Sequence, residues 1–155
     1  MTDGTVTVTL EAYFHEPIQV EVLSQAEVHS EKRYPTIGVV LADPIIRRQV
    51  TLRGRDTHTV YAFAESIIVS AQLSPQMRLR LIEKGTGIGE IMREDRVETY
   101  REISSIRRQK ATLWADYLGV HNEADVLVRN YTIQFRGRAV IAIEEVFPEA
   151  LYRTK

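Results

Sequence analysis

The segment 139–147, which reads Ala-Val-Ile-Ala-Ile-Glu-Glu-Val-Phe, constrains the fold more than any other part of the chain. Side chains alternate between the two faces of a strand, so every second residue from Ile141 to Phe147 shares one face, Glu145 among them. A charge among large apolar neighbours is costly unless it is paired or its pKa shifts. We therefore expect a specific partner for Glu145 inside the folded protein.

The overall composition is that of an ordinary globular protein. A chain of 155 residues can bury a proper core, and we expect residues 1–155 to form a single domain. The formal net charge of −1 argues against nucleic acid and membrane surfaces as partners, since binders of either carry a basic excess. Without cysteine there is no disulfide framework, thiolate nucleophile or cysteine-based zinc site. The start of the chain has no apolar leader, and no run approaches the roughly 20 apolar residues of a membrane span. These features predict a cytoplasmic protein.

Three segments have the pattern of helices. One is expected from about Thr7 and is ended by Pro17, because the residue before a proline disfavours helical geometry. A second begins at Ser74-Pro75, with serine as N-cap and proline as first helical residue, and ends at Gly85. Its Leu79 and Ile82 are expected to lie on one side of the helix. A third is expected over residues 107–118, where four apolar side chains cluster: Leu113, Trp114, Tyr117 and Leu118.

Alternation of apolar and polar residues predicts the strands. The first, from Ile18, is expected to bury Ile18, Val20 and Val22. Most strands are linked by short turns such as that at residues 53–57, which is typical of hairpins. We therefore predict an α+β fold with one antiparallel sheet. The expected strands cover residues 18–23, 45–52, 59–69, 97–106, 127–135 and 139–147.

Three charged residues are expected on apolar strand faces: Arg48, Arg129 and Glu145. A buried ion pair would account for any one of them. Together they suggest a binding site, because an arginine in a pocket can grip a substrate carboxylate with two hydrogen bonds. A carboxyl group in an apolar pocket has a raised pKa and can donate a proton near neutral pH. The combination predicts a small anionic ligand in an enclosed cavity.

Two other features of the sequence are weaker indications of function. The run Gly85-Thr-Gly-Ile-Gly89 follows a helix and lacks the Gly-Lys-Ser/Thr ending of a phosphate loop, so we interpret it as a helix cap or a turn whose backbone approaches a ligand. The histidines are scattered without the spacing of metal ligands or of a catalytic triad. They are His15, His29, His58 and His121.

Several motifs, in order and over nearly the whole chain, resemble the chorismate lyase family. The family has an Arg-Glu-Val/Ile-x-Leu strand, a Pro-Leu/Ile-Gly turn after a helix, and a Glu-x-Phe ending. This sequence departs from the pattern at Gln49, which replaces the usual acidic residue, and at Gly87, which replaces the proline. The matching segments are Thr5–Glu11, Arg48–Leu52, Gly87–Gly89, Thr99–Ile103, Arg129–Ile133 and Glu145–Phe147.

The resemblance implies an enzyme that removes pyruvate from chorismate to leave 4-hydroxybenzoate, without a metal or organic cofactor. It also implies a single antiparallel sheet with helices over an enclosed cavity. Arg48 would bind the ring carboxylate, and Glu145 would contact the hydroxyl end of the product. The backbone at Ile88 would contact the ligand, and Val6 would cover it.

Some questions remain open at the level of sequence. The spacing in the last hairpin allows Glu144 or Glu145 as the pocket carboxylate, and strand alternation favours Glu145. Arg129 or Arg101 is a candidate for holding the pyruvyl carboxylate, since a dianionic substrate in a dry cavity needs additional positive charge. Effector domains of transcription factors resemble the same fold, so a sensor of small aromatic acids is the alternative. The exact hydroxybenzoate isomer and the oligomeric state are not indicated.

Overall fold

The computed structural model describes residues 4–84 and 99–152. These residues form a six-stranded antiparallel sheet with the strand order β1-β2-β3-β6-β5-β4. This confirms the predicted α+β class with one antiparallel sheet. The strands are β1 (Ile18–His29), β2 (Pro44–Gly54), β3 (Val60–Val69), β4 (Thr99–Lys110), β5 (Asp125–Phe135) and β6 (Arg138–Pro148).

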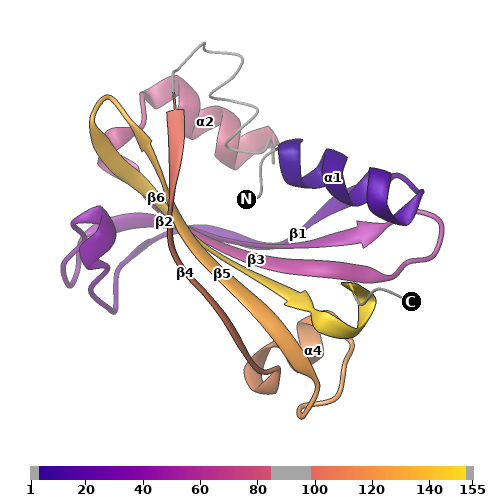
Figure 1. Ribbon diagram of the computed structural model, residues 1–155. Coiled ribbons are helices and arrows are strands. Elements are labelled where there is room, and N and C mark those ends of the chain that lie inside the picture. The colour runs from indigo at the N-terminus through magenta and orange to yellow at the C-terminus, as the bar shows by residue number, and fades with distance from the viewer. Residues whose placement is uncertain (1–3, 85–98, 153–155) are drawn as a thin grey trace.

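Helices cover both faces of the sheet. Helices α1 (Gly4–Phe14) and α2 (Pro75–Lys84) lie on one side, which we call the α1/α2 face, and α4 (Ala115–Leu118) lies on the other, the α4 face (Figure 1). No helix among the described residues is long and apolar enough to cross a membrane. The 3₁₀ helices are η1 (Pro35–Ile37), η2 (Ser70–Gln72), η3 (Thr112–Trp114) and η4 (Glu149–Tyr152).

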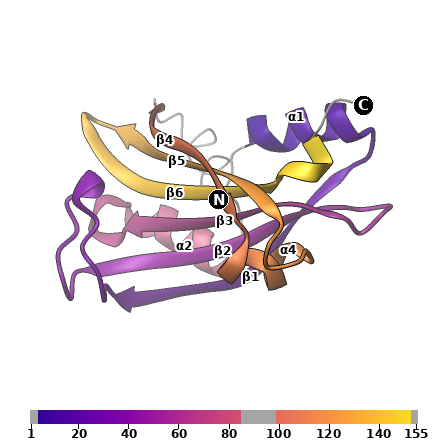
Figure 2. The same cartoon turned by 60° about the horizontal axis from the view of Figure 1, so that its bottom comes forward.

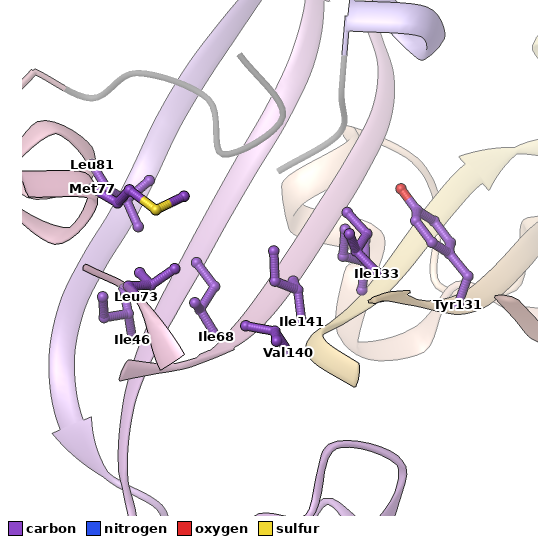
Figure 3. Close-up of a cluster of buried hydrophobic side chains, with 10 residues drawn as sticks. Ile46, Ile68, Leu73, Met77, Leu81, Tyr131, Ile133, Val140 and Ile141 are labelled. Carbon is purple, nitrogen blue, oxygen red and sulfur yellow. The ribbon is translucent and has the colours of Figure 1, made fainter. Parts of the chain in front are cut away.

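Two apolar clusters attach the helices α1 and α2 to their face. Met77 and Leu81 of α2 pack on a row of isoleucines from β2, β3, β6 and β5, with Tyr131 at the end of the row (Figure 3). Leu10 of α1 packs on Leu52 and Ala62 near the far ends of β2 and β3. Burial of such side chains typically contributes about 1.5–3 kcal/mol each, so these contacts fix the helices over the sheet.

The α2 helix begins as the sequence predicts. The backbone N–H of Met77 donates to Oγ of Ser74 at 3.2 Å, which is the expected N-cap hydrogen bond. The buried face of the helix carries Met77 and Leu81, whereas Leu79 is 55% exposed. The predicted end at Gly85 lies outside the described residues.

Two predictions from the sequence were wrong. The 107–118 segment is not one helix, because β4 continues to Lys110 in register with β5, and only η3 and the short α4 follow. Pairing with a neighbouring strand overrides the local helical pattern there. Val20 and Val22 of β1 are each 40% exposed, since β1 is an edge strand with a neighbour on one side only.

Candidate active site

Arg48 is the largest fully buried side chain among the described residues, with no exposed surface. It lies in the middle of β2, where alternation directs it to the α1/α2 face, as predicted from the sequence. Burial lowers the pKa of Arg48 to about 10, because the charged form loses its hydration. The guanidinium therefore remains charged at neutral pH, in surroundings where an anion would be attracted strongly.

Small side chains lie beside Arg48 on the same face. Across β3, Ser66 pairs with Arg48, and Ala64 and Ala62 follow at alternate positions. The next strand is β6, in which Ala64 pairs with Glu145. Arg48 and Glu145 are thus two strand spacings apart, or roughly 10 Å across the sheet, and Glu145 is offset by two residues along β6, since Ser66 pairs with Ile143. The side chains of β3 that lie between these two residues are short and fill little of the space above the sheet.

Glu145 is completely buried and has two side-chain partners, both from β5. Nε and Nη2 of Arg129 both donate to Oε1 of Glu145, the first at 2.9 Å. The hydroxyl of Tyr131 donates to Oε2 at 3.1 Å. The partner that the sequence required for Glu145 is therefore Arg129, its direct neighbour in the β5–β6 register, together with Tyr131.

Tyr131 is a site residue that the sequence did not single out. It is 2% exposed, and burial, followed by the charge of Glu145, raises the pKa of its hydroxyl. The hydroxyl therefore stays protonated and is a permanent donor to Glu145. The ring also contacts two cations, with the guanidinium carbons of Arg129 and Arg101 at 5.1 and 5.6 Å from its centre. Figure 3 shows its hydroxyl directed away from the β5 ribbon.

The structure brings most of the predicted site residues to one face. Arg48, Glu145 and Arg129 lie near the middle of the α1/α2 face, and Arg101 lies on the same face in β4, opposite Ile133. Val6 is half-buried in α1, against the cluster that contains Leu52 and Ala62. Ile88 and the glycine-rich run around it lie outside the described residues.

The two candidate glutamates of β6 point to opposite faces. Glu144 lies on the α4 face and accepts from Nδ2 of Asn130 at 3.1 Å and from Nη2 of Arg107 at 3.5 Å. Its side chain is 32% exposed, whereas that of Glu145 is wholly covered. Only Glu145 shares the face of Arg48, which agrees with the strand alternation read from the sequence.

The arrangement can bind an anion at one end and take part in proton transfer at the other. Among residues 4–84 and 99–152, the guanidinium groups of Arg48, Arg129 and Arg101 and the carboxylate of Glu145 lie on this part of the face, so their summed charge is positive. Arg129 uses two of its five N–H groups on Glu145, and an arginine can also grip a second anion. Glu145 is an acceptor held by an arginine and a phenol, which are the partners of an ionised carboxylate. It is better suited to accept a proton than to donate one.

Comparison with solved structures shows the fold. The chain is similar to PhnF from Mycobacterium smegmatis, with a TM-score of 0.73 and 11% identity over 97% of this chain and 66% of that one. The effector domain of the same protein gives a TM-score of 0.71 and 13% identity, with 97% and 91% covered. A GntR-family transcriptional regulator from Bacillus cereus gives 0.69 and 8% identity, with 89% and 96% covered.

Comparison of sequences shows the family. The chain is 28% identical to a chorismate pyruvate-lyase of Mycobacterium leprae, over 98% of this chain and 73% of that protein. It is 22% identical to a chorismate pyruvate-lyase of Mycobacterium tuberculosis, over 97% of this chain and 78% of that protein. The family model described as Chorismate pyruvate-lyase Rv2949c-like matches residues 1–155. The resemblance seen in the sequence motifs is thereby confirmed, and the chain belongs to the Rv2949c-like chorismate pyruvate-lyase family.

Proposed function

We propose that this protein is a chorismate pyruvate-lyase, which eliminates pyruvate from chorismate and releases 4-hydroxybenzoate or an isomer of it. The observation that carries the proposal is the pair of wholly buried charges, Arg48 and Glu145, on the face covered by α1 and α2. Buried charge of this kind costs stability and is characteristic of functional sites. Membership of the family gives the chemistry that such a pair would serve.

Arg48 binds the ring carboxylate of the substrate in this proposal. Its burial strengthens the attraction, because the surroundings have a lower effective dielectric constant than water. Chorismate carries a second carboxylate on its enolpyruvyl group. Arg129 and Arg101, which lie on the same face at the β5 and β4 side, are the candidates to hold it. Val6 of α1 covers the ligand in this scheme. The backbone contact at Ile88 stays a prediction from the resemblance.

Glu145 assists the elimination itself. The bond between the ring carbon and the ether oxygen breaks, and the hydrogen on the adjacent ring carbon, which also bears the hydroxyl, leaves as a proton. The electron pair of that C–H bond completes the aromatic ring, and the released enolate takes up a proton to become pyruvate. As a carboxylate held by Arg129 and Tyr131, Glu145 lies at the hydroxyl end of the ligand and serves the proton transfer.

The test is incubation of the purified protein with chorismate, followed by measurement of pyruvate and hydroxybenzoate by chromatography. We expect equal amounts of both products. Arg48→Ala should lower turnover by about 100-fold or more, since it removes a buried charge-assisted contact. Arg47→Ala is the matched control and should leave turnover within about threefold, because Arg47 lies on the opposite face and pairs with Glu65 at 3.0 Å. Full activity of Arg48→Ala would contradict the scheme.

A non-catalytic binding module is the second candidate. It is favoured by one observation, the similarity of the fold to the effector domain of PhnF and to a GntR-family transcriptional regulator. In that case, chorismate would remain unchanged, and the protein would bind a hydroxybenzoate in an Arg48-dependent manner. Release of pyruvate from chorismate favours the lyase, whereas unchanged chorismate together with Arg48-dependent binding of 4-hydroxybenzoate, measured by titration calorimetry, favours the binding module. A single-domain chain, a cytoplasmic location and the absence of nucleic-acid and membrane partners stay predictions from the sequence.

A further inference from the structure

Strand β4 forms one margin of the sheet and carries large apolar side chains that are exposed. Tyr100, Ile103 and Ile106 are 61%, 56% and 66% exposed. Within residues 4–84 and 99–152, β4 pairs with β5 on one side and with no strand on the other (Figure 2). An edge of this length, with apolar side chains along it, is a template for pairing with another strand.

A bulge divides β4 into two halves. The register with β5 shifts between Ile103 and Ser105, which leaves Ser104 as the extra residue. Ile103 pairs with Tyr131 and Ile106 with Arg129, so both isoleucines lie on the α1/α2 face beside the partners of Glu145. The bulge therefore places two isoleucines three residues apart on one face, which strict alternation would not allow.

The residues that flank the isoleucines have opposite charge. Glu102 precedes Ile103 and lies on the α4 face, and Arg107 follows Ile106 on that same face. The side chains of Glu102 and Arg107 already have hydrogen-bond partners within the chain. Nε2 of Gln134 donates to Glu102 at 2.8 Å, and Arg107 donates to Asn130 at 2.5 Å and to Glu144 at 3.5 Å. The half-strand before the bulge thus ends in an acidic and an apolar residue, and in the half-strand after it Ser105 is followed by an apolar and a basic residue.

We propose that β4 pairs antiparallel with β4 of a second copy of this chain, around a two-fold axis between Ser104 and Ser105. In this register, Ile103 of each copy faces Ile106 of the other, and Glu102 faces Arg107. The residues that face each other across the two copies also lie on the same face of the sheet, because the two-fold axis passes through the bulge. The contact is isologous and closes as a dimer. Cross-strand apolar and opposite-charge pairs are the interactions that stabilise neighbouring strands.

The remaining charges of β4 are accommodated in the same register. Arg101 would face Arg108 of the second copy, which alone would be repulsive. Arg108 is already paired, with Nη2 3.1 Å from Asp125 and Nε 2.9 Å from Glu149. The guanidinium of Arg101 lies over the ring of Tyr131. Both cations therefore have compensating neighbours in their own chain.

The opposite edge of the sheet is a poorer partner for itself. Val20, Val22 and Val28 of β1 are each about 40% exposed, so this edge also offers apolar surface. Its charged side chains, Glu21 and Glu27, are both acidic, and β1 contains no lysine or arginine. Two copies joined along β1 would have no opposite charges to pair. Pairing of β1 with β4 would be heterologous and would produce rings or open chains of molecules, not a two-fold dimer.

The dimer would also extend the apolar surface of the candidate active site beyond β4. Ile103 and Ile106 lie next to Tyr131 and Arg129, and the second copy would add its own two isoleucines to the same rows. The face that holds Glu145 would thereby be screened from water along its β4 side. The proposal does not depend on the proposed catalytic function, because it concerns assembly alone.

The first test is the molar mass of the purified protein by light scattering over a dilution series. We expect about twice 17.8 kDa for the wild type. Glu102→Arg should shift the mass to that of the monomer, because it places arginine opposite arginine. Glu21→Arg on the β1 edge is the matched control and should leave the dimer intact. Circular dichroism confirms that each variant is folded. A wild type that is monomeric throughout, or larger than a dimer, would overturn the proposal.

The second test reads the register directly. The chain has no cysteine, so an introduced pair is unambiguous. Oxidation of Ile103→Cys/Ile106→Cys should give a covalent dimer on a non-reducing gel, because these positions face each other across the axis. Ile103→Cys/Arg108→Cys is out of this register by two residues and should cross-link at least tenfold less. Equal cross-linking of the two double variants would exclude the proposed pairing.

Discussion

Glu16 and Glu145 are two buried carboxylates, each of which accepts a hydrogen bond from a tyrosine, but their other partners differ in kind. Glu16 is 7% exposed and accepts from the backbone N–H groups of Asp56 and Thr57 at 2.9 and 3.0 Å. The hydroxyls of Thr57 and Tyr61 donate to its other oxygen at 2.8 and 2.5 Å. Within the described part of the chain, the hydrogen bonds to Glu145 come from the side chains of Arg129 and Tyr131.

The difference separates a structural carboxylate from a functional one. The donors to Glu16 belong to the hairpin between β2 and β3, and two of them are backbone groups that the hairpin fixes in place. Gly54 lies directly against this carboxyl group, since a Cβ there would be 2.4 Å from Oε1 of Glu16. Nothing in that arrangement can turn toward a ligand. Arg129 is 32% exposed and long, so Glu145 has a partner that can be shared with a substrate.

The largest expected effect is on activity at Glu145. Glu145→Gln should lower turnover of chorismate by about 100-fold or more, because it removes the negative charge that the proton transfer requires. Glu16→Gln should leave turnover per folded molecule unchanged and lower the melting temperature. Product release and thermal unfolding, measured on both variants, check the prediction. If Glu16→Gln lost as much activity as Glu145→Gln while keeping its melting temperature, the distinction between the two carboxylates would fail.

Removal of the tyrosine hydroxyl should lower activity at Tyr131 but not at Tyr61. The effect at Tyr131 should be smaller than that of Glu145→Gln. Tyr131→Phe keeps the ring that contacts Arg101 and Arg129 but removes the donor to Glu145. We expect a fall in kcat of about tenfold, which corresponds to about 1.4 kcal/mol for one hydrogen bond, with little change in KM. Tyr61→Phe is the matched control and should retain kcat. An unchanged kcat in Tyr131→Phe would show that the hydroxyl does not position Glu145.

Strand alternation made the charged part of the site predictable. Arg48 and Glu145 could be assigned to one face because the period of a strand is fixed and each interrupts an apolar row. Tyr131 lies on the same face, but a tyrosine in an apolar row is not an anomaly, so no pattern in the sequence selects it. Its role depends on the register that brings it beside Glu145.

The parts that could not be predicted depend on contacts between distant segments. Glu16 stands between a helix and a strand with no local pattern, and its partners lie about forty residues away in the β2–β3 hairpin. The sequence predicts a helix over residues 107–118 because the apolar side chains that follow Lys110 cluster there, and nothing local shows that β4 continues to Lys110. Its pairing with β5, as far as Lys110 opposite Asp125, decides the outcome.

The smallest expected effect is the acid dependence of stability at Glu16. Its hydrogen bond from Tyr61, followed by those from Thr57 and Asp56, lowers the pKa of Glu16 from 4.5 to about 2 against the opposing effect of burial. A depressed pKa stabilises the folded state fully above about pH 4.5, and this contribution is lost as the pH falls toward 2. The wild type should therefore lose more stability than Glu16→Gln between pH 5 and pH 2.5, when urea midpoints are compared.

Asp125, whose pKa is lowered by Lys110, contributes in the same direction in both proteins and cancels in the comparison. The exposed Glu123→Gln should retain the acid dependence of the wild type. Parallel curves for the wild type and Glu16→Gln would mean that the hairpin donors do not favour the charged carboxylate, and the contrast with Glu145 would then have to be drawn from activity alone.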